Sequence, residues 1–142
     1  MVNNDAAGGS RSEVRVDLRV IYGDTDQMGV VYYANYLRYF ESGRNEFLRA
    51  HGLVYREFEH EHQVFLPVVE AQVSYKQPAR YDDLVSVFTG LPRIGKASVR
   101  FQYRLVRGEE LLATGHTVHA CVSRAGQVVA LPGSVVTLLR GL

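Results

Sequence analysis

Hydrophobic and polar residues alternate along most of this chain, and a period of two is typical of half-buried β-strands. The first alternating segment covers residues 14–22. Four further β-rich segments fill the second half of the chain, at residues 69–75, 84–91, 99–105 and 111–122. Because Gly108 lies between the last two segments, we expect them to form a hairpin.

The period changes to that of a helix after the first strand. From Asn35 onward, one helical face collects Tyr36, Leu37, Phe40, Phe47, Leu48 and His51. Asn35 is predicted to cap this helix and Gly52 to end it. Gly43 lies in the middle, where glycine weakens a helix, so we expect the helix to approach a neighbouring backbone there. A weaker helical pattern covers residues 54–60, and Ser134 is predicted to cap a short final helix.

This order of elements predicts an α+β fold, in which a five-stranded, largely antiparallel sheet wraps around one long helix. A helix of about five turns cannot cover both faces of such a sheet. The other face therefore meets either water or a second subunit. The many aromatic and aliphatic residues on the strands favour a partner, so we expect a homodimer or a dimer of dimers, such as a homotetramer.

Composition narrows the class of protein. A chain of 142 residues fits one domain, which we place at residues 13–142, after a polar, glycine-containing tail at residues 1–12 that is predicted to be disordered. The formal net charge is +1 and the basic residues are scattered, so no nucleic-acid partner is expected. Without a signal-peptide pattern or an apolar run of ~20 residues, the chain is expected to be cytoplasmic. The single cysteine, Cys121, excludes an internal disulfide.

The segment 22–36 combines two parts that acyl transfer requires. It is rich in turn-forming residues and leads directly from a strand into the long helix. Unpaired backbone N–H groups at a helix start stabilise a developing oxyanion, and a carboxylate just upstream attacks or activates water at the same carbonyl. Taken alone, however, Asp26 is more often a cap or turn residue than a catalyst.

The same segment resembles the signature of the 4-hydroxybenzoyl-CoA thioesterase family, within the hotdog superfamily. The matching residues are Asp24, Asp26, Gly29, Val30, Val31, Tyr32, Tyr33, Asn35 and Tyr36. Further matches are Phe40, Glu41 and Arg44 in the helix, and the turn Tyr81-Asp82-Asp83. The resemblance spans about residues 14–132. It implies a hotdog fold and an acyl-CoA thioesterase, which cleaves a thioester into free acid and coenzyme A.

The resemblance also implies roles for particular residues. Asp26 would be the catalytic carboxylate, as nucleophile or as general base. The backbone N–H of Tyr33 would polarise the thioester carbonyl, and Gly29 would allow the close approach that aims Asp26. Lys96 would hold the phosphates of coenzyme A, with Arg93 and Arg100 as further substrate-binding candidates. Neither a cofactor nor a metal is implied, and an acyl carrier protein is an alternative carrier of the acyl group.

One departure concerns Tyr33. Thioesterases from the bacterial Tol–Pal cluster are very similar in this segment but carry a histidine at this position. That histidine has been assigned a role in the chemistry. A phenol, unlike an imidazole, does not act as a base near neutral pH. Either the backbone N–H is the only essential feature there, or the mechanism differs in detail.

Other chemistries are weaker interpretations. Glu59-His60-Glu61-His62 lacks a further ligand pair at a zinc spacing, and His116 and His119 face opposite sides of a strand. Cys121 has no legible histidine partner, and no serine lies in a Gly-x-Ser-x-Gly elbow. Two other classes remain open. A hotdog dehydratase would carry a Gly-Asp-x-Asn-Pro pattern and a following histidine, and a non-catalytic acyl-CoA-binding protein would not need Asp26.

Overall fold

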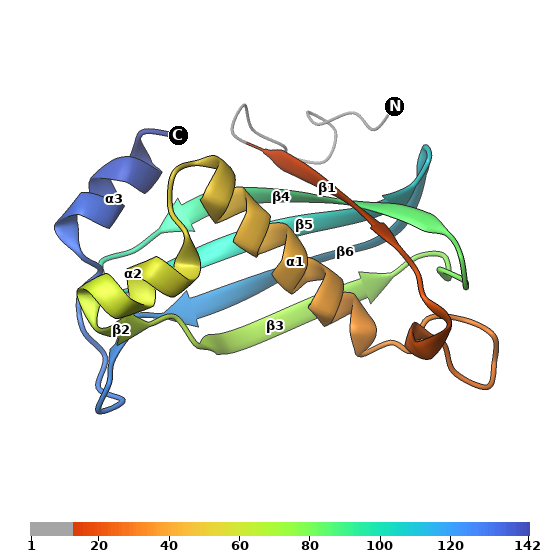
Figure 1. The fold of residues 1–142 in the computed structure, drawn as a ribbon, viewed down its shortest axis with the longest axis horizontal. Coiled ribbons are helices and arrows are strands. Elements are labelled where there is room, and N and C mark those ends of the chain that lie inside the picture. Colours follow the sequence, from red (N-terminus) through yellow and green to blue (C-terminus); the bar gives the residue numbers. More distant parts are fainter. Residues whose placement is uncertain (1–12) are drawn as a thin grey trace.

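The computed structural model describes residues 13–142, and its centre is a five-stranded sheet in which every neighbouring pair is antiparallel (Figure 1). The strand order across the sheet is β1-β4-β5-β6-β3. The strands are β1 (Val14–Arg19), β3 (Val68–Tyr75), β4 (Leu84–Ile94), β5 (Ser98–Arg107) and β6 (Glu110–Ala120). The predicted five strands are confirmed.

The helices account for most of the remaining chain. They are the one-turn 3₁₀ helix η1 (Tyr22–Asp24), α1 (Asn35–Ala50), α2 (Tyr55–His62) and α3 (Gly133–Arg140). Figure 1 shows α1 lying across one face of the sheet, with α2 and α3 near the end where β4 stops. A small second sheet joins β2 (Val64–Phe65) to β7 (Val122–Ser123). The sequence did not predict this sheet, because two-residue strands carry no periodicity.

The contact of α1 with the sheet is as close as Gly43 predicted. A Cβ atom added to Gly43 would lie 2.5 Å from Thr89 Oγ1 and 2.6 Å from Val87 Cγ1. No side chain therefore fits between the helix and β4 at this point. On either side of Gly43, Phe40 and Phe47 are fully buried. The helix axis is thus fixed against the sheet, and so is the position of its N-terminus.

Two predicted caps are wrong. Asn35 is the first residue of α1, its N-cap is Ala34, and no side chain caps the helix start. The Asn35 side chain instead donates a hydrogen bond to the backbone oxygen of Asp24 (2.9 Å). Ser134 does not cap α3, whose N-cap is Pro132, again without a side-chain bond. Both residues were placed by their helix-capping propensity alone, which cannot tell a cap from the first helical turn.

The first strand is shorter than its pattern predicted. β1 ends at Arg19, and Tyr22 belongs to η1. The alternation continued into a segment that leaves the sheet, and Ile21 and Tyr22 are exposed there. No helix within residues 13–142 is long and apolar enough to span a membrane.

A row of buried, hydrogen-bonded polar side chains lies beneath α1. His119 is 2% exposed, and its ring lies 2.8 Å from Leu66 O through Nδ1 and 2.8 Å from Thr117 Oγ1 through Nε2. The Thr117 hydroxyl also shares a hydrogen bond with Tyr103 OH (2.6 Å). Burial lowers the pKa of His119 to about 4, and the positive charge of Arg44 acts in the same direction. The imidazole is therefore neutral in the folded protein near neutral pH.

This buried histidine predicts a pH-dependent stability. Between pH 6.5 and about 4, the unfolded chain takes up a proton at His119 and the folded chain does not, so the free energy of unfolding falls as the pH falls. The loss from this residue should approach about 3 kcal/mol at the lower limit. His119→Gln should flatten this part of the curve in urea unfolding between pH 7 and 4. An unchanged slope in the variant would contradict this prediction.

Candidate active site

The loop between β1 and α1 is folded by its own main chain. Asp26 donates its N–H to Val30 O (2.9 Å), and its carbonyl oxygen accepts the N–H of Gly29 (2.9 Å). Gly29 has φ +80°, in the left-handed region where residues with a Cβ are strained. A bridge between Thr25 and Val31 closes the loop. The sequence around Asp26 therefore forms a tight, pre-set turn.

The Asp26 side chain belongs both to this turn and to a pocket. Its Oδ1 accepts the N–H of Met28 (2.9 Å), and its Oδ2 takes part in no hydrogen bond within residues 13–142. The half-buried carboxylate lines a pocket of ≈ 270 Å³. The expectation of a turn residue and the expectation of a catalytic carboxylate are thus compatible, because one oxygen holds the turn and the other is left for a ligand.

Tyr33 lines the same pocket, two residues before α1 begins. Among residues 13–142, no acceptor takes its backbone N–H, whereas its carbonyl oxygen accepts a hydrogen bond from Tyr75 OH (2.9 Å). An N–H group without a partner at the positive end of a helix is suited to bind an oxyanion. The Tyr33 phenol is exposed and tilted against the ring of Tyr32, with 4.6 Å between the ring centroids.

Asp24, the first aspartate of the Asp-x-Asp motif, connects the loop to α1. Asp24 is 5% exposed, and its side chain accepts a hydrogen bond from Tyr39 OH (2.8 Å). Burial raises the pKa of Tyr39, and the bond to the Asp24 carboxylate raises it further. The backbone oxygen of Asp24 accepts the N–H of Tyr32 and the side-chain amide of Asn35, both at 2.9 Å. Asp24 therefore holds the helix start beside Asp26, a role that the motif alone did not assign.

The opposite wall of the pocket comes from the end of β3 and the residues after it. Tyr75, Lys76, Gln77 and Pro78 line it, together with Tyr36 from α1. Sequence reasoning missed these residues, since the motif around Asp26 says nothing about which later strand approaches it. The one available signal was that Tyr75 to Ala79 precedes the matching turn Tyr81-Asp82-Asp83.

Comparison with known proteins now decides the family. The sequence profile of the thioesterase-like superfamily matches residues 20–139. The chain belongs to this superfamily. It is 36% identical over 124 residues to the acyl-CoA thioester hydrolase YbgC of Escherichia coli O6:H1. This alignment covers 86% of this chain and 92% of the relative. It is also 33% identical over 117 residues to a 1,4-dihydroxy-2-naphthoyl-CoA hydrolase of Synechococcus elongatus, covering 80% and 86% of the two chains.

A solved structure agrees with these relatives. The probable thioesterase from Bartonella henselae superposes with a TM-score of 0.80 at 32% identity, over 84% of this chain and 99% of the other. The predicted hotdog fold and the predicted resemblance to thioesterases are therefore confirmed.

The structure of this thioesterase superfamily member separates the three basic candidates from Asp26. Lys96 lies in the turn after β4, and Arg93 pairs with Arg100 at the start of β5. The Asp26 loop lies at the opposite end of the sheet, where β1 stops and β4 begins (Figure 1). β4 has 11 residues, which at ~3.3 Å each span roughly 35 Å. Within one chain, these cations do not reach the pocket.

Residues 13–142 hold no group of three or more His, Cys, Asp or Glu side chains that could bind a metal ion. His116 pairs with Glu70 (2.6 Å), away from His119. Cys121 is fully buried, and burial raises the pKa of its thiol, as expected of an unreactive cysteine.

Proposed function

We propose that this protein hydrolyses acyl-CoA thioesters in the pocket between Asp26 and the start of α1. Membership of the thioesterase-like superfamily makes the protein a thioester hydrolase, and its relatives are named for acyl-CoA substrates. One observation carries the placement of the site. The carboxylate of Asp26 and the unpaired N–H of Tyr33 line the same pocket, and these are the two groups that acyl transfer needs.

The arrangement supports a simple division of roles. The thioester carbonyl oxygen accepts the N–H of Tyr33, which stabilises the negative charge that develops there. Asp26 either attacks the carbonyl carbon, giving an anhydride that water opens, or removes a proton from an attacking water. In both routes the C–S bond breaks and coenzyme A leaves as its thiol. No other acid or base among residues 13–142 lines this pocket except Lys76 and the tyrosine phenols.

The lining of the pocket favours an apolar or aromatic acyl group. Met28, Val30 and Pro78 contribute aliphatic surface, and Tyr36 and Tyr75 contribute rings in edge-to-face contact, with 4.9 Å between their centroids. A hydrolysis screen tests the activity and the substrate together. The panel contains aromatic, short-chain and medium-chain acyl-CoA thioesters, together with the matching acyl carrier protein thioesters. Hydrolysis releases free thiol, and we expect this release from at least one thioester of the panel. Failure of every thioester in the panel would contradict the proposal.

We further propose that two copies of the chain form a dimer through β3. β3 forms an outer edge of the sheet, and Val69 and Tyr75 on it are 61% and 48% exposed. Such an edge offers free backbone groups to another strand. In a two-fold dimer joined through β3, the two copies of the strand run antiparallel. The Tyr75 end of one subunit, beside its Asp26 pocket, would then lie next to the Val68 end of the other.

The same symmetry reconciles Lys96 with substrate binding. Val68 pairs with His119, and His119 pairs with Val99 on β5, so the turn containing Lys96 lies at the Val68 end of its own sheet. In the proposed dimer, this end of one subunit faces the Asp26 pocket of the other. Lys96, Arg93 and Arg100 would therefore meet the coenzyme A of a substrate whose thioester lies in the neighbouring pocket.

Lys96→Ala should raise KM for an acyl-CoA substrate and leave kcat nearly unchanged. Lys96 is exposed, and its contact with a phosphate at the protein surface is screened by salt, so it contributes binding energy rather than transition-state energy. A truncated pantetheine thioester, which lacks those phosphates, should be hydrolysed equally well by the variant. Steady-state kinetics on both substrates measure this difference. An equal loss on both would refute the placement of Lys96.

A further inference from the structure

The turn formed by residues 78–83 contacts the Asp26 loop on both of its sides. Before the loop, the N–H and the C=O of Val20 both bond to the backbone of this turn, at 2.9 and 3.0 Å. After the loop, Val31 donates its N–H to Ala79 O (2.8 Å). The two ends of the segment that presents Asp26 therefore rest on one turn of the chain.

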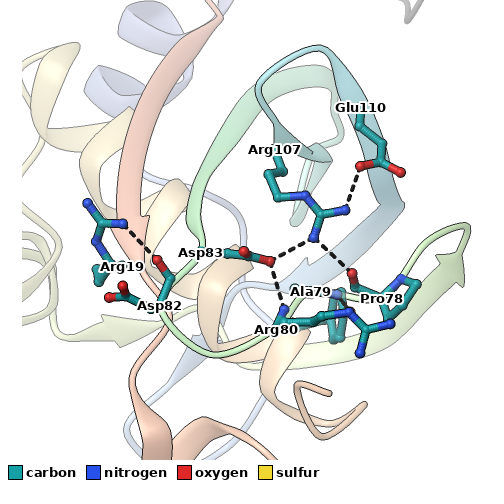
Figure 2. Close-up of polar contacts among 9 residues, drawn as sticks. Arg19, Pro78, Ala79, Arg80, Asp82, Asp83, Arg107 and Glu110 are labelled. Atoms are coloured by element: carbon teal, nitrogen blue, oxygen red, sulfur yellow. Dashed lines mark hydrogen bonds and ion pairs between the residues drawn. The ribbon is translucent and has the colours of Figure 1, made fainter. Parts of the chain in front are cut away.

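Arg107, the last residue of β5, closes this turn. Its Nη1 donates hydrogen bonds to the carboxylate of Asp83 (2.7 Å) and to Pro78 O (3.1 Å). The same carboxylate accepts the backbone N–H of Arg80 (2.8 Å). Figure 2 shows the guanidinium between the two ends of the turn, with Glu110 bonded to its other side. One side chain thus joins the first residue of the turn to the last.

This pair is partly shielded from water. The side chains of Arg107 and Asp83 are 30% and 22% exposed. Burial acts to raise the pKa of Asp83, but the hydrogen bonds from Arg107 and from the Arg80 N–H outweigh it and hold that pKa below its usual value. Both groups are therefore charged at neutral pH, and their interaction is less screened than that of an exposed surface pair.

The turn also forms part of the pocket wall. Pro78 lines the pocket, and the adjacent Ala79 is fully buried. The N–H of Ala79 donates to Tyr36 OH (3.2 Å) on α1, and Tyr36 lines the pocket as well. A shift of this turn would move the wall and, through Val31, the loop that carries Asp26.

We propose that Arg107 is a positioning residue for thioester hydrolysis, which sets the place of Asp26 and of the pocket wall by closing the 78–83 turn. Arg107 does not line the pocket, so its side chain would not contact a substrate bound there. Its effect passes through the backbone of Pro78, Ala79 and Val31. The inference rests on the proposed catalytic role of Asp26.

Arg107→Met tests this inference, because methionine keeps an apolar stem and removes the hydrogen bonds. We expect kcat to fall ~10-fold or more, with a much smaller change in KM, since a displaced carboxylate affects the reaction more than substrate binding. Arg107→Lys, which retains a cation for Asp83, should recover part of kcat. Glu110→Gln is the matched control, as it removes an ion pair of Arg107 that faces away from the turn. The control should keep the wild-type kcat.

A double variant separates positioning from general damage. If Arg107 acts through Asp26, adding Arg107→Met to Asp26→Asn should lower the residual rate little further. An equal loss in both backgrounds would overturn the inference, and so would a wild-type kcat in Arg107→Met. If Arg107→Met does not fold, Asp83→Asn takes its place with the same expected outcomes. If Asp26→Asn is active, the proposed catalytic role of Asp26 is wrong. If Asp26→Asn is inactive but Arg107→Met is fully active, only the positioning role of Arg107 is wrong.

Discussion

Asp26→Asn should lower kcat by at least ~10²–10⁴ while changing the melting temperature little. Asparagine has nearly the same shape as aspartate, and its side-chain oxygen can accept the Met28 N–H as Asp26 Oδ1 does. The tight turn should therefore persist. What is lost is the negative charge of the oxygen that takes part in no hydrogen bond, and with it the nucleophile or base.

The measurement pairs kcat on the best thioester with a thermal melt of the same preparation. Asp17→Asn is a matched control, because Asp17 is a carboxylate of β1 that bonds to Arg15 and Ser86 and does not line the pocket. It should keep the wild-type kcat. If Asp26→Asn keeps a near wild-type rate and melts several degrees lower, Asp26 is a turn residue only. A protein that binds acyl-CoA without hydrolysing it would be a second outcome against the proposal.

Local pattern accounts for much of the fold. The alternation in residues 99–105 and the one-sided face of residues 35–51 predicted β5 and α1, because burial of one face imposes its period on the sequence. Gly43 predicted a close approach, because glycine weakens a helix and is favoured in its middle where a larger side chain would not fit against a neighbour. These features depend on neighbours along the chain or on one packing partner.

Features that depend on distant neighbours were not predictable in the same way. The sequence order places β3 before β4, yet β3 pairs with β6 at the far edge of the sheet. For this reason neither the pocket wall at Tyr75 nor the separation of Lys96 from Asp26 could be read from periodicity. Asn35 illustrates the same limit at a single residue, because its side chain reaches back to Asp24 rather than capping its own helix.

The proposed dimer interface through β3 leads to the second large expected effect. Ala71→Lys should convert the protein from a dimer to a monomer and lower kcat/KM by ~10² or more. Ala71 is exposed near the middle of β3, so the variant chain should still fold. In a two-fold pairing through β3, each new lysine would lie near the lysine of the other subunit, and like charges on paired strands repel.

Light scattering at micromolar concentration measures the mass, and the same samples give kcat/KM. Ala50→Lys is the matched control, because Ala50 is an exposed alanine at the end of α1 and is not part of β3. This control should remain dimeric and active. Since association follows mass action, the activity of Ala71→Lys should rise with protein concentration. A stable Ala71→Lys monomer with full activity would show that one chain holds a complete site, and the cations at the Val68 end of the sheet would then have no part in binding coenzyme A.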